Sequence, residues 1–160
     1  MTDGTALPRF KRAFIDACQT AGVQNVSYQS PMQPEDMIGE NGTGAACWFA
    51  DEATGTLDIR VMGDSYLWID ETWQVPFIIQ VLGLDTDADQ EAVDQLACEV
   101  LGDVLTTFAD PSFGITDDSV VQTFAAIPVG ANPWKGGILP SNSRAAGFQL
   151  TIELSSRLRI

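Results

Sequence analysis

The stretch Phe148–Ile160, "FQLTIELSSRLRI", decides the fold expected for this sequence. Apolar residues occupy every second position from Phe148 to Ile160, interrupted once at Ser156, and polar residues fill the positions between them. Such alternation is typical of a β-strand with one buried face. Thirteen extended residues span about 43 Å, and a compact domain of this length has a diameter of about 40 Å. The sequence therefore predicts a terminal strand that reaches the edge of the domain or a neighbouring molecule.

Two parts of this strand have different expected roles. Phe148–Leu154 should pair within the subunit's own sheet, because its apolar face is dense enough to need a core. Burial should weaken after Ser156, which leaves the tip free to contact acidic and apolar groups of an adjacent subunit. A solvated tip of a simple in-domain strand is the alternative. The tip residues that the interface hypothesis includes are Arg157, Leu158, Arg159 and Ile160.

Two amphipathic helices precede the terminal strand. Apolar residues at three- and four-residue spacing predict the first helix over about Leu7 to Ala21, and Gly22 ends it. An apolar stripe from Val93 to Phe108, including Leu105, predicts the second. Asp87 or Asp89 can cap the start of this second helix. Basic residues near the start of the first helix oppose its dipole; they form either a solvated face, the commoner case, or a contact with an acidic partner outside the chain.

The remaining segments alternate as strands. A short extended piece follows the first helix, "ACWFA" and "TLDIRVM" flank the expected hairpin turn "DEATG", and Pro76 in "TWQVPFIIQVLG" is expected at a bulge or an edge-facing position. "VVQTFAAIPVG" is the strand before the terminal one. The order α-β-β-β-β-α-β-β predicts an α+β fold in one domain, residues 1–160. In this fold a mixed or antiparallel sheet packs against the two helices on one face.

Charge is the strongest feature of the composition. The chain has 22 acids, 8 bases and no histidine, for a formal net charge of −14. No Lys or Arg occurs from Val61 to Trp134, whereas thirteen Asp and Glu do. Tight nucleic-acid binding is not expected of such a chain, because phosphate contacts need clustered cations. Without histidine the commonest general base is missing, and most zinc chemistry with it.

Other residues give no sign of catalysis. Cys18, Cys47 and Cys98 are widely spaced and are interpreted as small buried apolar residues in a reducing compartment. The acids of "DTDADQEAVDQL" resemble a calcium loop, but Gln90 and Leu96 stand where Gly and Glu are required, and helix capping explains the acids better. We expect neither an enzyme nor a metal or cofactor. No apolar stretch approaches the roughly 20 residues that span a membrane, and no signal peptide is evident, so we expect synthesis in the cytoplasm.

The loop "ANPWKGGILPSNSRAAG" carries apolar side chains that are costly to leave in water. They either fold back onto the core or anchor a subunit contact, where aromatic residues and Arg are enriched. The loop residues included in the interface hypothesis are Trp134, Lys135, Ile138, Leu139 and Arg144.

The layout resembles that of tail terminator proteins of long-tailed bacteriophages, including the lambda-type minor tail proteins. The strand "ETWQVPFIIQVLG", an acidic linker, the helix "EAVDQLACEVLGDVL" and the closing alternating strand carry this resemblance. It covers roughly Leu7 to Ile160 and is one of element order, without an invariant motif. The segment "SPMQPEDMIGENGTG" and the loop around Trp134 depart from the shorter members of the family.

The resemblance implies a structural virion protein, made in the bacterial host cytoplasm and placed at the tail and neck. Its subunits would form a homo-hexameric ring that ends the tail tube and contacts the tail tube protein and the head-completion or neck protein. Genomic DNA would pass through an acidic lumen without specific binding, and neither a membrane nor a cofactor is involved. The alternatives are another ring protein of the phage neck, such as a head-closure or connector protein, and a small acidic ligand-binding regulatory domain.

Overall fold

A computed structural model describes residues 4–31, 43–63, 66–83, 89–110, 113, 121–134 and 143–160 of the chain. The described residues form two α-helices and a six-stranded mixed sheet, so the α+β prediction is confirmed. The elements are α1 (Leu7–Thr20), β1 (Val26–Ser27), β2 (Thr43–Phe49), β3 (Thr54–Met62), β4 (Tyr66–Gly83), α3 (Gln90–Thr106), a 3-10 turn (Thr107–Ala109), β5 (Val121–Pro133) and β6 (Arg144–Arg159). Their order along the chain is the predicted one.

Two long antiparallel strands, β4 and β6, form the centre of the sheet. The strand order is β1-β2-β4-β6-β5, and β3 lies beside β4 as well. Only the short β1–β2 pairing is parallel among the described strands. The register of β4 with β6 runs without a break from Trp68↔Arg159 to Gly83↔Arg144. The terminal strand is therefore paired within its own chain almost to its last residue.

The predicted hairpin between β2 and β3 is wrong. Both strands pair with β4 and neither pairs with the other: β2 lies along Phe77–Gly83, and β3 lies along Tyr66–Gln74. They form one interrupted strand on the side of β4 that faces away from β6. The interruption lies opposite Pro76, whose carbonyl accepts a hydrogen bond from the Ala50 backbone N–H at 3.0 Å. Proline has no N–H to donate, and Pro76 was predicted at a bulge or an edge-facing position. The β4–β6 register passes through Pro76 without a bulge, and its nitrogen faces the gap between β2 and β3, so the edge-facing alternative is the one that the structure supports.

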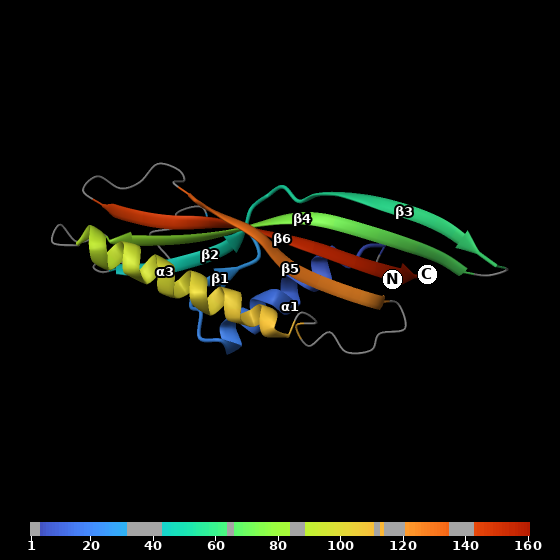
Figure 1. Cartoon of the computed structure of the whole chain (residues 1–160), viewed down its shortest axis with the longest axis horizontal. Helices are drawn as coiled ribbons and strands as arrows, with labels where there is room; N and C mark the ends of the chain where they lie inside the picture. The colour runs from blue at the N-terminus through green and yellow to red at the C-terminus, as the bar shows by residue number, and fades with distance from the viewer. Residues whose placement is uncertain are drawn as a thin grey trace.

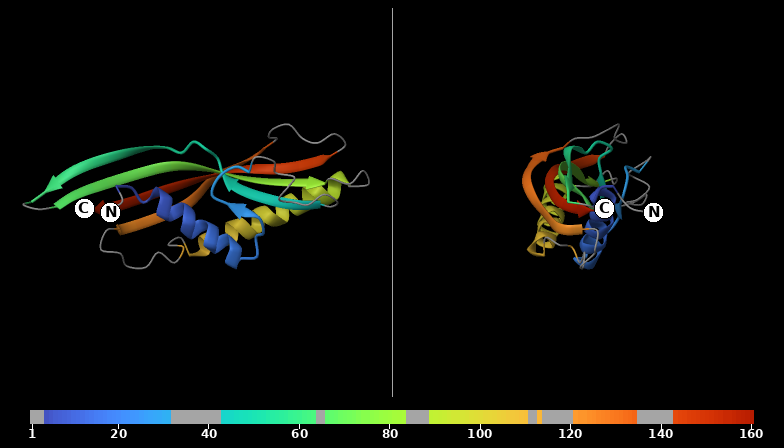
Figure 2. Two further views of the ribbon diagram at one scale, coloured as in Figure 1. Left: turned by 180° about the vertical axis from the view of Figure 1, so that it is seen from behind. Right: turned by 90° about the vertical axis from the view of Figure 1, so that its right-hand side faces the viewer.

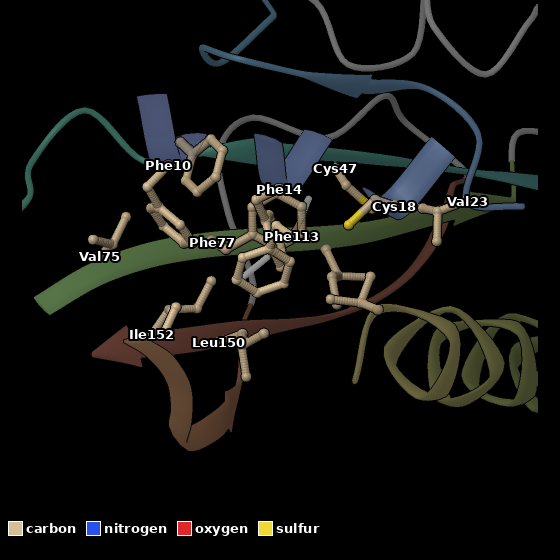
Figure 3. Close-up of a cluster of buried hydrophobic side chains, with 14 of the residues drawn as sticks. Phe10, Phe14, Cys18, Val23, Cys47, Val75, Phe77, Phe113, Leu150 and Ile152 are labelled. Atoms are coloured by element: carbon tan, nitrogen blue, oxygen red, sulfur yellow. The ribbon is translucent and has the colours of Figure 1, made fainter. Parts of the chain in front are cut away.

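Both helices cover the same face of the sheet (Figure 1). Figure 3 shows the core between α1 and the sheet, in which Phe10, Phe14 and Cys18 of α1 contact side chains of β2, β4 and β6. The Phe14 and Phe77 rings pack edge to face with centroids 5.0 Å apart. Each large side chain buried here contributes about 3–5 kcal/mol relative to alanine. The predicted periodicity of α1 is thus confirmed by burial of one stripe.

The helix ends follow from local chemistry. Gly22, which follows the C-cap residue Ala21 of α1, adopts a φ of +91°, which most residues avoid. Asp89 caps α3 by accepting a hydrogen bond from the Glu91 N–H at 3.0 Å, so capping by Asp89 is confirmed. One member of the predicted α3 stripe, Leu105, is exposed instead of buried. Cys98 is also exposed, so only Cys18 and Cys47 are the buried thiols that the sequence predicted.

The sheet extends beyond the helices at one end. Figures 1 and 2 show β3 and the first part of β4 projecting past the start of α1, with the end of β6 beside them. We call this part the arm and define it as β3, Tyr66–Gln74 of β4 and residues 153–160, which pair with it. One face of the arm carries exposed apolar side chains and the other carries arginines. Together these two faces form the candidate site.

Candidate subunit interface

The predicted interface residues lie at two separate ends of β6. Trp134 and Arg144 lie where β6 begins, and the tip residues lie where it ends, about 50 Å away along an extended strand. The structure therefore does not bring the loop and the tip together in one patch. Lys135, Ile138 and Leu139 lie outside the described residues. Arg144 is exposed at the first position of β6, paired with Gly83.

Trp134 folds back onto its own chain, which is the first of the two alternatives for the loop. Its ring packs edge to face against Trp48, with centroids 5.7 Å apart, and joins a cluster with Ala46 and Ile78. These residues alternate with the core positions of β2 and β4, so the cluster lies on the sheet face opposite the helices. The Trp134 N–H donates to the Gly147 carbonyl at 2.9 Å. Trp134 is half-buried and keeps one side accessible.

The tip of β6 corrects the interface hypothesis for Leu158, whereas the interface role of Arg157 stays a prediction. Leu158 is only 1% exposed because Ala6 and Ile69 of the same chain cover it, so its side chain is not available to a neighbouring subunit. Arg157 forms a two-pronged contact with Asp70 of the same chain, at 2.6 and 3.1 Å. The expected loss of burial after Ser156 is also wrong, because Ser156 and Leu158 are both buried. Removal of the last four residues would therefore damage the core as well as any interface.

One face of the arm carries an apolar patch that sequence reasoning missed. Opposite residues of an antiparallel pair share a face of the sheet. The β3 residues opposite Leu67, Ile69 and Glu71 therefore lie on the helix side, and they are Val61, Ile59 and Leu57. The helices end before this point, and no described segment covers the patch. Val61 is 76% exposed and Ile59 is 63% exposed. We call the exposed apolar residues here the arm patch: Leu57, Ile59, Val61, Leu67 and Ile160.

The reverse face of the arm carries arginines. Arg159 lies over the Tyr66 ring, 3.7 Å from its centroid, and Arg157 lies 5.9 Å from the Trp68 ring. Hydrogen bonding to Arg157 lowers the pKa of Asp70, and hydrogen bonding to Asp70 raises the pKa of Arg157. These pairs are exposed, so they add little stability and chiefly fix the side-chain positions.

A buried carboxylate joins the arm to the helical layer. Glu71 of β4 is 2% exposed and accepts hydrogen bonds from four groups. The donors are the Thr5 hydroxyl, the Ala6 N–H, the Trp73 indole and the Ser156 hydroxyl. Glu71 thereby caps the start of α1, which has no side-chain cap of its own.

The site offers contact surface. Within the described ranges, no three Cys, Asp or Glu side chains come close enough together to hold a metal ion. No described helix is long and apolar enough to cross a membrane. What the arm presents is an uncovered apolar face backed by arginine and aromatic side chains, which are the residue types enriched at protein interfaces.

No protein-family model matches this chain, and no curated protein is significantly similar to it.

Proposed function

We propose that this protein is a structural subunit that assembles with copies of itself through the arm. The observation that carries the proposal is the arm patch, in which five large apolar side chains lie on one face beyond the helices. Clustered exposed apolar side chains of this kind mark interaction sites, because leaving them in water is costly. Glu71 and its four donors hold the arm at a fixed angle to α1, so the patch is presented in a defined position.

The assembly that we propose is a hexameric ring that ends the tail tube of a long-tailed phage and joins it to the neck. The element order described above supports this, because it is the feature on which the resemblance to tail terminator proteins rests. In this role the protein is not an enzyme and needs no cofactor. The net charge of −14 suits a ring through which DNA passes without adhering.

The assembly proposal is tested by the mass of the protein in solution. Val61→Ser should abolish oligomers seen by sedimentation at physiological salt and leave the melting temperature within about 2 °C, because Val61 is largely exposed. The matched control is Ile127→Ser, which changes a 50% exposed residue of β5 outside the arm. If the native chain stays a monomer at every salt concentration, the protein is not a self-assembling subunit.

The phage role has its own test. The purified protein should bind the open end of tail tubes and stop their elongation, as seen by electron microscopy of a polymerising tail tube protein from the same phage. Binding to DNA-filled heads instead would identify a head-closure or connector protein. A monomer that binds neither particle would favour the ligand-binding domain.

A further inference from the structure

The outer edge of β3 is a sheet edge that lies open along its whole length. Among the described strands β3 pairs only with β4, and the register runs unbroken from Thr54↔Gln74 to Met62↔Tyr66. Residues 54–61 are all exposed, so no described segment covers this edge (Figure 1). Every second residue of such a strand directs its backbone N–H and C=O away from the sheet, where another strand can bind them.

The other described edges of the sheet are protected against such pairing. β5 carries Pro128 and Pro133, which have no N–H to donate, and its ladder has two register shifts. β1 is only two residues long. β3 contains neither proline nor lysine. Of the described edges, β3 is therefore the one that can pair with another strand over a full strand length.

The sequence of β3 is self-complementary about Ile59. In both directions from Ile59, a charged residue is followed by an apolar one: Asp58 and Leu57 on one side, Arg60 and Val61 on the other. When two copies run antiparallel with Ile59 facing itself, Asp58 lies opposite Arg60 of the second copy. Leu57 then lies opposite Val61 of the second copy.

We propose that β3 pairs antiparallel with β3 of a second copy of the chain in this register. The inference rests on the proposed self-assembly through the arm and specifies the strand and the register of the contact. Pairing of this kind satisfies the free backbone groups of both edges. It also places Leu57, Ile59 and Val61, which share one face and are 48%, 63% and 76% exposed, beside apolar side chains of the second copy.

Charge selects the register of this pairing and is not its driving force. Arg60 already contacts Asp58 of its own chain at 2.7 Å, so the two groups offer little net attraction to a neighbour. Moving the axis by one residue would place Asp58 opposite Asp58, or Arg60 opposite Arg60, and like charges directly opposite each other destabilise a strand pair. In the proposed register acids and bases alternate around the axis, and these clashes are avoided.

The contact has two-fold symmetry, which determines what it can build. A contact between identical surfaces closes after two subunits. It therefore joins subunits in pairs, and the proposed ring also needs a contact between unlike surfaces elsewhere on the chain. Because the paired strand is short, the interface is small and the dimer should be weak, so covalent trapping is the suitable measurement.

A disulfide at the axis tests the pairing. Ile59→Cys places two thiols opposite each other, and opposite residues of antiparallel strands have Cα atoms about 4.5–5.5 Å apart, within the range that a disulfide spans. Cys98→Ala is added because Cys98 is exposed, whereas Cys18 and Cys47 are buried. Mild oxidation at physiological salt should convert this variant to a covalent dimer. The matched control is Ile127→Cys in the same background, a 50% exposed position on the protected strand β5, which should stay monomeric on the gel.

A mixing experiment tests the register. Leu57→Cys and Val61→Cys are prepared separately, each with Cys98→Ala. Residue 57 faces residue 61 of the second copy and lies about 13 Å along the strand from residue 57 of that copy, so the mixture should cross-link about tenfold or more above either variant alone.

Each outcome separates the hypotheses. If the native chain forms oligomers by sedimentation but Ile59→Cys gives no covalent dimer, the β3 pairing is overturned and self-assembly is left intact. Equal cross-linking by the mixture and by Leu57→Cys alone would also overturn the proposal, because the strands would then lack the proposed register. A chain that stays a monomer at every protein and salt concentration, with no cross-link, would refute the self-assembly on which the inference rests.

Discussion

At the scale of single residues, Glu71 shows why a buried carboxylate can be retained in an apolar core. Its four donors come from the segment before α1, from β4 itself and from β6, so the charge is satisfied and three parts of the chain are fixed together. Removing the acceptor leaves these buried donors without a partner, which costs more than the hydrogen bonds themselves contribute.

We therefore expect Glu71→Ala to lower the free energy of unfolding by about 3 kcal/mol, and Glu71→Gln to lower it by about 1–2 kcal/mol, because the amide keeps one acceptor oxygen. Urea unfolding measures both. The control is Glu153→Ala, which removes a half-buried partner of Gln74 and should cost less than about 1 kcal/mol. Equal losses at Glu71 and Glu153 would contradict the role assigned to Glu71.

The three thiols give a second prediction at this scale. Burial raises the pKa of Cys18 to about 12 and also raises that of Cys47, whereas Cys98 is exposed. Because the thiolate is the reactive form, Cys18 and Cys47 stay protonated and inert at pH 8. A thiol reagent such as DTNB should titrate one cysteine per native chain rapidly and three after unfolding in guanidinium. Rapid reaction of two or more native thiols would show that the core around α1 opens.

At the scale of elements, the arm depends on close packing of β3 against β4. Gly55 pairs with Trp73, and a Cβ at Gly55 would lie 2.6 Å from the Trp73 ring and closer still to the Thr72 carbonyl oxygen. The Trp73 indole therefore lies against the Gly55 backbone, and its N–H donates a hydrogen bond to Glu71 at 3.0 Å. Glycine is required at position 55 because a side chain would clash with these neighbours. The backbone conformation does not require it, since the φ of Gly55 is not in the positive range.

Gly55→Ala should accordingly cost about 1–3 kcal/mol of unfolding free energy, because the ring and the strand must move apart. Gly102→Ala provides the opposite case, since Gly102 lies in α3 with open space around it. That change should increase stability by about 0.5–1 kcal/mol through helix propensity. Thermal unfolding followed by circular dichroism tests the pair, and a stabilising Gly55→Ala would mean that the arm strands are loosely packed.

At the scale of the whole molecule, charge opposes the self-assembly that we propose. Each chain carries a formal charge of −14, so the proposed hexamer would accumulate strong self-repulsion. Salt screens this repulsion, and the Debye length falls from about 10 Å at 0.1 M to about 3 Å at 1 M.

We expect monomers at low protein concentration and low salt, and larger species as salt rises. Light scattering across a sodium chloride series measures the mass. A mass that falls as salt rises would show that attractive charge pairs between subunits outweigh the overall repulsion, and it would contradict this prediction.

The sequence by itself determined the elements and their order. The helices and strands follow from apolar residues spaced 3.6 and two residues apart, and two helix ends follow from Asp89 and Gly22. All of these features depend on neighbours within a few residues, which a sequence displays directly. The length of the terminal strand was predictable for the same reason.

Only the tertiary structure decided which surfaces are covered. Leu57, Ile59 and Val61 alternate like core residues, yet they are exposed because α1 does not extend over this part of the sheet. Leu158 is buried because Ala6 packs against it. Local periodicity marks the face of a strand that is apolar. Whether that face meets a helix, solvent or another molecule depends on contacts between segments as far apart as Ala6, Glu71 and Ser156, and those contacts exist only once the whole chain has folded.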